Sequence, residues 1–348
     1  ALMARSSSTP VRTCSIGFLD KEHDESPYAR EISELFNTDH KEYFVQEEIN
    51  ELIKDLPKYF DEPFADSSAV PPYYVSRLAR RDVTVAISGD GGDESFAGYE
   101  KYVVDMHENR VRSLAPRPLL ILLNTLAKAG DAVFFRKACS LTTAALMDPG
   151  KAFYTTNTFI HDDRLRSLLS ERLKIVVSGY DPSAHTMIHW NRMAGADHLS
   201  RILYTDIKSY LPGDILVKVD RMSMANSLEV RSPLLDYRVL EFAAKIPSSL
   251  KLNGQLKKYI LKEAFKKILP PHVMNRKKHG FTVPLDSWFR NELMEFGYEN
   301  ILNYPAMEEY ISKPCLTALW ESHRDRRTNN GTLLWSLLMF SLWHKRYM

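Results

Sequence analysis

The sequence contains little cysteine and no long uninterrupted apolar run. Its three cysteines lie far apart and none belongs to a Cys-x-x-Cys pair, which argues against a disulfide framework and against a zinc site. The most apolar internal stretch, residues 119–135, is interrupted by polar residues, so we expect a buried amphipathic helix and no membrane span. No basic segment followed by an apolar run is visible near Ala1, so no signal peptide is recognisable. These absences favour a reducing, cytoplasmic environment without membrane contact.

An excess of charge of one sign is absent too. The 348 residues have a formal net charge of +2 at pH 7, and this balance argues against a dedicated nucleic-acid-binding protein. Hydrophobic residues make up 44% of the chain and charged residues 26%, which excludes a wholly disordered protein. Because 348 residues exceed what one hydrophobic core usually supports, we expect two domains or one domain with a large appendage.

The first third of the chain alternates strand and helix patterns. Strand-like runs occupy residues 13–18, 41–45 and 83–87, and the last is apolar enough for a strand that is buried on both faces. Helical spacing fills the gaps, and the second helical pattern should end at Pro57. This alternation predicts an α/β fold with an open parallel sheet.

The pattern changes after about residue 103, where helical spacing dominates and no persuasive strand occurs. We therefore predict an α/β domain over residues 1–115 and a mostly helical region over residues 116–348.

The strongest local signal is the segment SGDGGDE at residues 88–94, directly after the third strand-like run. Ligands of open α/β sheets bind at the carboxyl ends of the strands. Glycines let the backbone approach a ligand and turn its N–H groups towards an anion, while carboxylates can hold Mg²⁺. The segment therefore suits a magnesium nucleotide.

Other ligand-binding loops fit this segment less well. No Gly-Lys-Ser/Thr follows it, Glu94 stands where a dinucleotide fingerprint has its third glycine, and the alternating Asp/Asn pattern of a calcium loop is missing. The alternative without a ligand is a tight turn joined to a helix cap.

Residues 88–94, followed by Phe96, Gly98 and Tyr99, resemble the second nucleotide-binding motif of the asparagine synthetase family. Trp343 near the end also fits this family. Four further segments resemble motifs of the family in the same order: SIGF at 15–18, DRMSMANSLEVRSPLLD at 220–236, KKYIL at 257–261 and RKKHGFTVP at 276–284.

The resemblance implies an AMP-forming ligase with an ATP-pyrophosphatase-like sheet, which uses ATP and Mg²⁺. In such enzymes the side-chain carboxylate of aspartate attacks the α-phosphate, giving β-aspartyl-AMP and pyrophosphate, and ammonia then displaces AMP to leave asparagine. The ammonia comes from glutamine, which a separate N-terminal glutaminase domain hydrolyses. The implied partners are these small molecules, without nucleic acid, and the formation of a homodimer stays open.

The resemblance also implies roles for single residues around the nucleotide. Ile16 would contact adenine, Ser88 and Gly89 would bind the nucleotide, and Asp93 would help to hold Mg²⁺ and pyrophosphate. The loop at residues 276–278 could close over the phosphates or could be an ordinary surface loop.

The remaining implied roles concern the chemistry. Asp90 occupies the acidic position linked to acyl-adenylate formation and ammonia attack, and Glu94 would line the acceptor pocket. Lys258 would stabilise the pentavalent phosphorus or the leaving pyrophosphate, although a lysine without such a motif is expected to be solvated. Five charged residues of the long signature could instead form buried ion pairs: Asp220, Arg221, Glu229, Arg231 and Asp236.

One family motif, the pyrophosphate loop Ser-Gly-Gly-x-Asp-Ser-Ser, does not occur in this sequence. In the family it follows the first strand, ahead of the strand that corresponds to residues 13–18. We therefore interpret the chain as a C-terminal piece of a longer protein, without the first strand, this loop and the glutaminase domain, and expect the piece alone to be inactive. The alternative is a naturally truncated, inactive variant.

Several functions compete with asparagine synthesis. The acceptor could be a sugar acid or another metabolite carboxylate, whereas a β-lactam-forming activity is disfavoured by the acid at Asp90. A non-catalytic nucleotide-binding homologue would not need an intact 88–94 segment and Lys258. A tRNA-modifying adenylating enzyme would usually carry a nucleic-acid-binding domain or reactive cysteines, and neither is evident.

Overall fold

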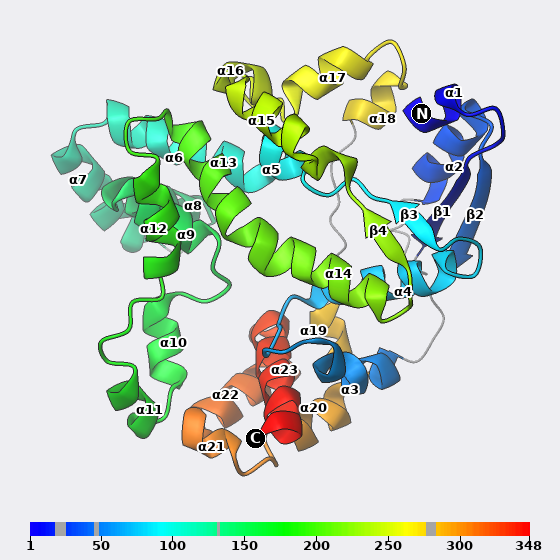
Figure 1. Ribbon diagram of the computed structural model, residues 1–348. Helices are drawn as coiled ribbons and strands as arrows, with labels where there is room; N and C mark the ends of the chain where they lie inside the picture. The colour runs from blue at the N-terminus through cyan, green and yellow to red at the C-terminus, as the bar shows by residue number, and fades with distance from the viewer. Residues whose placement is uncertain (18–25, 45–48, 131–132, 276–282) are drawn as a thin grey trace.

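The computed structural model describes residues 1–17, 26–44, 49–130, 133–275 and 283–348 (Figure 1). In this part of the chain the protein is mostly helical and contains two small parallel sheets. The strands are β1 (Arg12–Gly17), β2 (Asp39–Phe44), β3 (Val85–Ile87) and β4 (Glu229–Arg231).

The first ten α-helices of the described residues are, in chain order, α1 (Leu2–Ser6), α2 (Ser26–Leu35), α3 (Ile49–Tyr59), α4 (Val70–Ala79), α5 (Gly92–Phe96), α6 (Glu100–Leu114), α7 (Arg117–Lys128), α8 (Val133–Leu146), α9 (Pro149–Thr156) and α10 (Asp162–Leu168). Thirteen follow: α11 (Glu171–Val176), α12 (Ala184–Arg192), α13 (His198–Lys208), α14 (Leu216–Met224), α15 (Tyr237–Lys245), α16 (Ser248–Lys251), α17 (Tyr259–Phe265), α18 (Pro271–Asn275), α19 (Leu285–Trp288), α20 (Met294–Ile301), α21 (Met307–Tyr310), α22 (Lys313–Arg324) and α23 (Gly331–Tyr347).

The β1–β2 pair confirms the first two predicted strands. β1 pairs with β2 in parallel over its whole length, and α2 connects them as a crossover helix. Arg12 Nη1 donates to the carbonyl oxygen of Asp82 at 2.8 Å, and the Tyr43 hydroxyl donates to the Asp82 carboxylate at 2.8 Å. These bonds hold the first pair beside the residue that leads into β3.

The β3–β4 pair corrects two expectations. No strand was expected after residue 103, yet β4 pairs in parallel with β3. β3 is also not buried on both faces, because Val85 is 39% and Ile87 59% exposed. Within the described residues β3 has one hydrogen-bonded neighbour, which leaves its other edge open. A single open sheet that joins all four strands is therefore not observed, although Figure 1 places the two pairs on the same side of the molecule.

Two helical predictions also need correction. α3 continues through Pro57 to Tyr59, because a proline in the last turn removes only one backbone hydrogen bond. The apolar stretch 119–135 is not one buried helix: it divides between α7 and α8, with several leucines exposed. None of the described helices combines the length and the apolar character needed to cross a bilayer.

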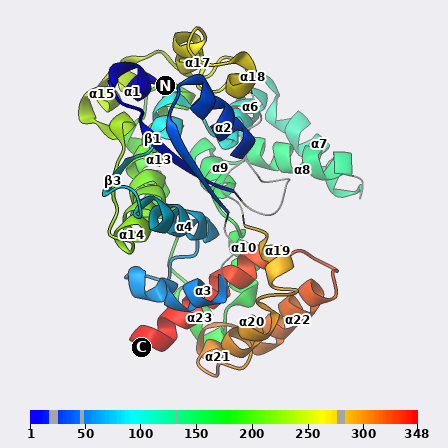
Figure 2. The same cartoon turned by 90° about the vertical axis from the view of Figure 1, so that its right-hand side faces the viewer.

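The main hydrophobic core joins the early helices α3 and α4 to the C-terminal helices α19, α20, α22 and α23. Ile53, Leu293 and Leu338 are fully buried in it, and Trp335 is 1% exposed. A second cluster around Tyr102 and Trp190 packs α6 against α9, α12 and α13. The views in Figures 1 and 2 agree that α3 lies next to α23, away from the strands. The division of the chain at residue 115 stays a prediction.

Truncation of Ile53 tests the main core. Ile53→Ala should lower the free energy of unfolding by about 2–5 kcal/mol, because it removes fully buried methyl groups and leaves a cavity. The measurement is urea unfolding followed by circular dichroism. Leu35→Ala, at a side chain that is 54% exposed, is the control and should change stability little; equal effects of both variants would contradict this core.

Candidate active site

The site is built where β3 and β4 end side by side. The backbone N–H of Ser88, the first residue after β3, donates to the carbonyl oxygen of Arg231 at 2.9 Å. The hydroxyls of Ser88 and Ser232 lie 2.8 Å apart, and the Ser88 hydroxyl donates to the Asp90 carboxylate at 2.7 Å. Parallel pairing thus brings two segments that are 144 residues apart to the carboxyl edge of one sheet, where α/β proteins bind ligands.

Two glycines of the loop have different surroundings. Gly91 has φ +85°, and a Cβ built there would lie 2.0 Å from Leu235 Cδ2, so the fold itself requires glycine at this position. A Cβ built on Gly89 would meet nothing within 4 Å. A tight turn therefore explains Gly91, whereas Gly89 borders open space that a ligand could fill.

Lys258 reaches this loop from a distant part of the chain. Its Nζ lies 3.0 Å from Asp93 Oδ1, and both side chains are partly buried. A Cβ on Gly98 would stand 1.8 Å from Asp93 Oδ1 and 2.3 Å from Lys258 Cε, so the missing side chain at Gly98 makes room for this ion pair. The structure thus joins the loop to the predicted lysine.

Two strained backbone conformations occur at the loop and at its lysine partner. Five described residues other than glycine have φ between 49° and 59°, and two of them, Ala97 and Lys258, adjoin α5 and α17. Such conformations cost about 1–3 kcal/mol each and gather at functional sites, where the surrounding structure enforces them. This concentration favours a ligand-binding role over an ordinary turn.

Glu94 is buried directly behind the loop. Its residue exposure is 1%, and the Tyr99 hydroxyl donates to Glu94 Oε1 at 2.6 Å. Burial raises the pKa of Glu94, and the hydrogen bond from Tyr99 opposes this rise only in part. Burial and the neighbouring Glu94 carboxylate raise the pKa of Tyr99 well above its ordinary value. Glu94 Oε2 has no hydrogen-bond partner among the described groups.

Tyr99 also contacts a second group of polar residues, which we call the polar layer. Its ring lies edge-on to Tyr210, with ring centroids 5.9 Å apart. Lys101 Nζ is 4.1 Å from the centre of the Tyr210 ring and 2.7 Å from Asp206 Oδ2. Asp206 is 1% exposed, so Lys101 supplies the positive charge that this buried carboxylate needs.

The polar layer continues to Asp214, the pKa of which the neighbouring Tyr210 hydroxyl lowers. Lys218 Nζ lies 3.8 Å from Asp214 Oδ1, donates to Ser68 Oγ at 2.7 Å and forms an ion pair with Asp66. Burial, followed by the charge of Asp66, raises the pKa of Asp214 to about 7. Burial also raises the pKa of Asp66, but the charge and hydrogen bond of Lys218 and the hydrogen bonds from Ser68 together lower it more.

We call this set the buried polar network: Glu94, Tyr99, Tyr210, Asp214, Lys218 and Asp66. Apart from Glu94, the sequence analysis assigned none of these residues a role. Their spacing follows ordinary helical patterns and forms no motif that points to a ligand.

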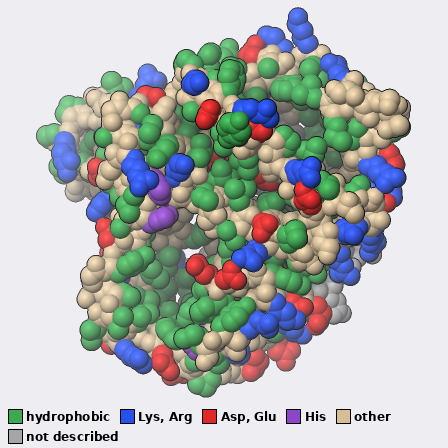
Figure 3. All heavy atoms as spheres, viewed as in Figure 1, with side chains coloured by type: hydrophobic (Ala, Val, Ile, Leu, Met, Phe, Trp, Pro, Cys, Tyr) green, Lys and Arg blue, Asp and Glu red, His purple; other side chains and the backbone are tan. Residues whose placement is uncertain are grey.

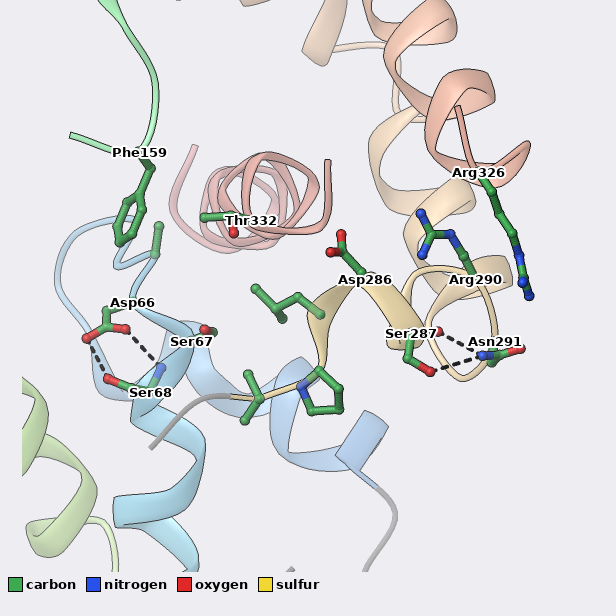
Figure 4. Close-up of a pocket in the computed structure, with 14 residues that line it drawn as sticks. Asp66, Ser67, Ser68, Phe159, Asp286, Ser287, Arg290, Asn291, Arg326 and Thr332 are labelled. Atoms are coloured by element: carbon green, nitrogen blue, oxygen red, sulfur yellow. Dashed lines mark hydrogen bonds between the residues drawn. The ribbon is translucent and has the colours of Figure 1, made fainter. Parts of the chain in front are cut away.

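The far end of the buried polar network opens on a cavity of about 690 Å³. Figure 4 shows Asp66 and Ser68 on one wall, below Phe159, and Asp286 and Arg290 on the opposite side. Asp66 Oδ1 accepts the backbone N–H of Ser68 at 2.9 Å, which fixes the turn that precedes α4. Residues 88–94 and Lys258 do not line this cavity, so it adjoins the candidate site only through the network.

Other predicted residues lie elsewhere. Ile16 is buried on β1 at 8% exposure and lies opposite Tyr43 in the sheet register, so it belongs to the first strand pair and not to the 88–94 loop. Residues 276–278 lie outside the described residues, and nothing tests their expected role.

The charged residues of the 220–236 segment form ion pairs, but these pairs are not buried as expected. Glu229 pairs with Arg231 at 2.7 Å, but their side chains are 55% and 66% exposed, because β4 presents both to solvent. Asp236 pairs with exposed Arg238 and caps α15, and Arg221 pairs with Asp61, which is largely exposed.

Asp93 is the carboxylate that resemblance assigns to Mg²⁺. No group of three His, Cys, Asp or Glu side chains converges as a metal site within the residues that the structure describes. Magnesium in nucleotide sites commonly takes one or two carboxylates and completes its shell with phosphate oxygens and water. Asp93 beside the open space at Gly89 fits such a supporting role.

The glycine-rich loop and the lysine at the carboxyl ends of two parallel strands define an α/β protein with a candidate anion-binding site. The family model for asparagine synthase matches residues 1–345. The chain therefore belongs to the asparagine synthase family, whose members use ATP and have a domain of the ATP-pyrophosphatase type.

Individual relatives agree with this assignment. Glutamine-hydrolysing asparagine synthetase 1 of Bacillus subtilis (strain 168) is 32% identical over 346 residues, which cover 97% of this chain and 53% of that protein. Glutamine-hydrolysing asparagine synthetase 3 of the same strain is 24% identical, over 78% of this chain and 40% of that protein. Amidase chyE of Penicillium rubens is 24% identical, over 77% and 43%. The chain spans about half the length of these curated relatives.

The two loop glycines make a matched stability test. Gly91→Ala should lower the free energy of unfolding by about 2 kcal/mol or more, because alanine is strained at this positive φ and collides with Leu235. Gly89→Ala has free space and should leave stability within about 0.5 kcal/mol of wild type. Denaturant unfolding of both variants measures the difference; a destabilised Gly89→Ala would show that the space is not open.

Asp214 should make stability depend on pH. Its carboxyl has an ordinary pKa of 3.8 and a folded-state pKa of about 7, so folding takes up a proton between these values. The resulting stabilisation is present at low pH and is lost as pH rises through 7. The Asp214→Asn variant has no carboxyl to ionise at this position, so it does not lose this stabilisation. The free energy of unfolding of the variant minus that of wild type should therefore increase by roughly 2–3 kcal/mol from about pH 5 to pH 8.

Asp220→Asn, at an exposed position of α14, is the control for this titration. Urea unfolding over the pH series should give a larger change for Asp214→Asn than for Asp220→Asn. Equal changes for the two variants would contradict the raised pKa of Asp214.

Proposed function

We propose that the protein to which this chain belongs catalyses ATP-dependent amidation of a carboxylate, with aspartate as acceptor and asparagine as product. The observation that carries the proposal is the Lys258–Asp93 ion pair, 3.0 Å long, which anchors the same loop that has open space at Gly89. A cation, a carboxylate and a glycine-rich loop at the end of a strand are what a magnesium nucleotide needs.

The nucleotide would lie along the loop after β3. Ser88 and Gly89 would bind it through the backbone, and Ile16 would contact adenine from the neighbouring strand pair. Asp93 would hold Mg²⁺, which lowers the negative charge that an incoming carboxylate meets. When the phosphates take over Lys258, Asp93 becomes available to the metal.

The chemistry would proceed in two displacements. A carboxylate oxygen of the acceptor attacks the α-phosphorus, the bond to the β-phosphate oxygen breaks, and pyrophosphate leaves. Lys258 would stabilise the charge on the pentavalent phosphorus and on pyrophosphate. Ammonia then attacks the acyl carbon and AMP leaves with the carboxylate oxygen. Asp90 would assist acyl transfer, and Glu94 would line the acceptor pocket.

Glu94 is suited to bind an acceptor substrate that carries an amino group. Its Oε2 is buried and lacks a partner among the described groups, so the α-ammonium of aspartate could satisfy it. A sugar acid offers hydroxyls at that point instead of a cation. The buried carboxylate therefore favours an amino-acid acceptor.

The wider architecture is part of the same proposal. The two strand pairs would belong to one open parallel sheet, in which a further strand could pair along the exposed edge of β3. Residues 1–115 would form the nucleotide-binding domain and residues 116–348 the helical region. Ammonia would come from glutamine through a glutaminase domain, and the relatives' greater length supports such an addition. A cytoplasmic location would supply ATP and aspartate.

A second class of carboxylate acceptor is also considered, because the relative from Penicillium rubens is named an amidase and not an asparagine synthetase. Amidation of another metabolite carboxylate, such as a uronic acid, would use the same ATP chemistry. A comparison of aspartate with uronic acids as acceptors separates the two functions.

Product analysis tests the proposal. With aspartate, Mg-ATP and glutamine or ammonia, the full-length protein to which this chain belongs should release AMP and pyrophosphate only when the acceptor is present, and asparagine should appear. Lys258→Ala should lower kcat by at least about 100-fold, because a preorganised positive charge is lost from the transition state. Lys257→Ala is the control, since Lys257 pairs with Glu100 outside the loop. Release of ADP and phosphate, or equal loss in both variants, would contradict the proposal.

A further inference from the structure

The α7–α8 hairpin projects from the rim of the molecule. Figures 1 and 2 agree that it lies at the edge, far from the strands. Its two helices are held together by Asn124, whose side-chain amide donates to Thr142 Oγ1 at 2.9 Å and Thr143 Oγ1 at 2.8 Å. Leu120 and Ala127 are buried on the same side of α7. The hairpin therefore has a packed inner side of its own.

A second apolar face of α7 points to solvent. Leu119, Leu122, Leu123 and Leu126 follow the spacing i, i+3, i+4, i+7 and are 45%, 56%, 44% and 57% exposed. Such spacing puts them in one stripe along the helix. At the start of α8 Phe134 is 75% exposed. Single exposed leucines are common, but a continuous apolar stripe on one helix, with an exposed aromatic ring on the partner helix of the same hairpin, marks an interaction surface.

The charges of the hairpin are mostly positive. Residues 117–146 contain four basic side chains, Arg117, Lys128, Arg136 and Lys137, and one acidic residue, Asp131, outside the described part. The described residues of α7 and α8 carry no acidic side chain. Figure 3 shows hydrophobic and basic side chains next to one another on the rim over these helices. The partner should therefore combine an apolar layer with negative charge.

We propose that the exposed face of the α7–α8 hairpin docks on an anionic lipid surface. An amphipathic helix with leucine and phenylalanine on one side and lysine and arginine on another lies in the interface of such a surface, with its apolar stripe among the acyl chains. Basic side chains near an anionic leaflet add electrostatic attraction to this contact. None of the described helices could cross a bilayer, so the hairpin lies on the membrane surface, and this contact departs from the expectation, drawn from the sequence, of no membrane contact.

Charge argues against the other occupants. A second copy of the chain that used the same face would bring eight basic side chains together against two acidic ones, because each hairpin contributes four basic residues and one acidic residue. An acidic protein would satisfy the charges, but a phospholipid surface satisfies both the charges and the length of the apolar stripe. This inference does not depend on the proposed enzymatic function.

Vesicle sedimentation tests the proposal. The chain should sediment with vesicles of phosphatidylcholine and phosphatidylglycerol in a two-to-one ratio at least about tenfold more than with pure phosphatidylcholine, and high salt should reduce the difference. The triple variant Leu122→Ser, Leu126→Ser, Phe134→Ser should lose most of this binding. Ile175→Ser with Val176→Ser is the control, because these side chains are 76% and 72% exposed on α11; it should bind as wild type does.

A second readout does not depend on the triple variant. Phe134→Trp should shift its fluorescence to the blue on addition of the anionic vesicles and should be quenched by brominated lipid. Equal binding to both vesicle types, unchanged binding of the triple variant, or no quenching would overturn the proposal. A dimer in analytical ultracentrifugation that the triple variant abolishes, or binding of polyglutamate in place of vesicles, would overturn it in favour of a protein partner.

Discussion

The parallel pairing of β3 with β4 is the constraint on which the candidate site depends. Its register sets Ile87 opposite Arg231, so Ser88 and Ser232 leave the sheet together. Because the side-chain period of a strand is two residues, a slip by one position would turn Ile87 and its neighbours to the opposite faces. In this register Leu235 fills the space over Gly91, and the backbone of Gly91 has a positive φ. The helix α5 begins directly after this glycine and presents Asp93 to Lys258.

Burial of the charged groups behind the loop is the second consequence of this geometry. Glu94 and Asp206 are each 1% exposed, and such carboxylates are tolerated only with donors or cations beside them. Tyr99 and Lys101 supply these partners, and Lys218 does the same for Asp66 further along the buried polar network. One oxygen of Glu94 stays without a partner among the described groups. A donor group of a polar substrate bound at this point would give this oxygen a partner.

The sequence allowed the elements with strong local signals to be predicted. β1, β2 and α4 follow from clear patterns, and the 88–94 loop follows from its glycines and carboxylates after an apolar run. The tie between this loop and Lys258 could be expected only from resemblance to a family, because no local rule links a lysine to a loop so far away. β4 escaped prediction since three residues with charges at both ends do not look like a strand. The exposure of β3 and of the α7 leucines could not be read from apolar runs either, because a run shows hydrophobicity and not the neighbours that would cover it. The buried polar network arises from long-range packing of α13 and α14 against the loops, and its residues have no common motif.

Transfer of oxygen from acceptor to nucleotide is the measurement that tests the central claim most directly. The protein to which this chain belongs would convert aspartate labelled with ¹⁸O in its side-chain carboxylate in the presence of Mg-ATP and ammonia. The AMP formed would then be analysed by mass spectrometry. If the carboxylate attacks the α-phosphorus beside Lys258 and Asp93, each AMP carries one ¹⁸O atom. Unlabelled AMP, or label found only in phosphate, would contradict the account.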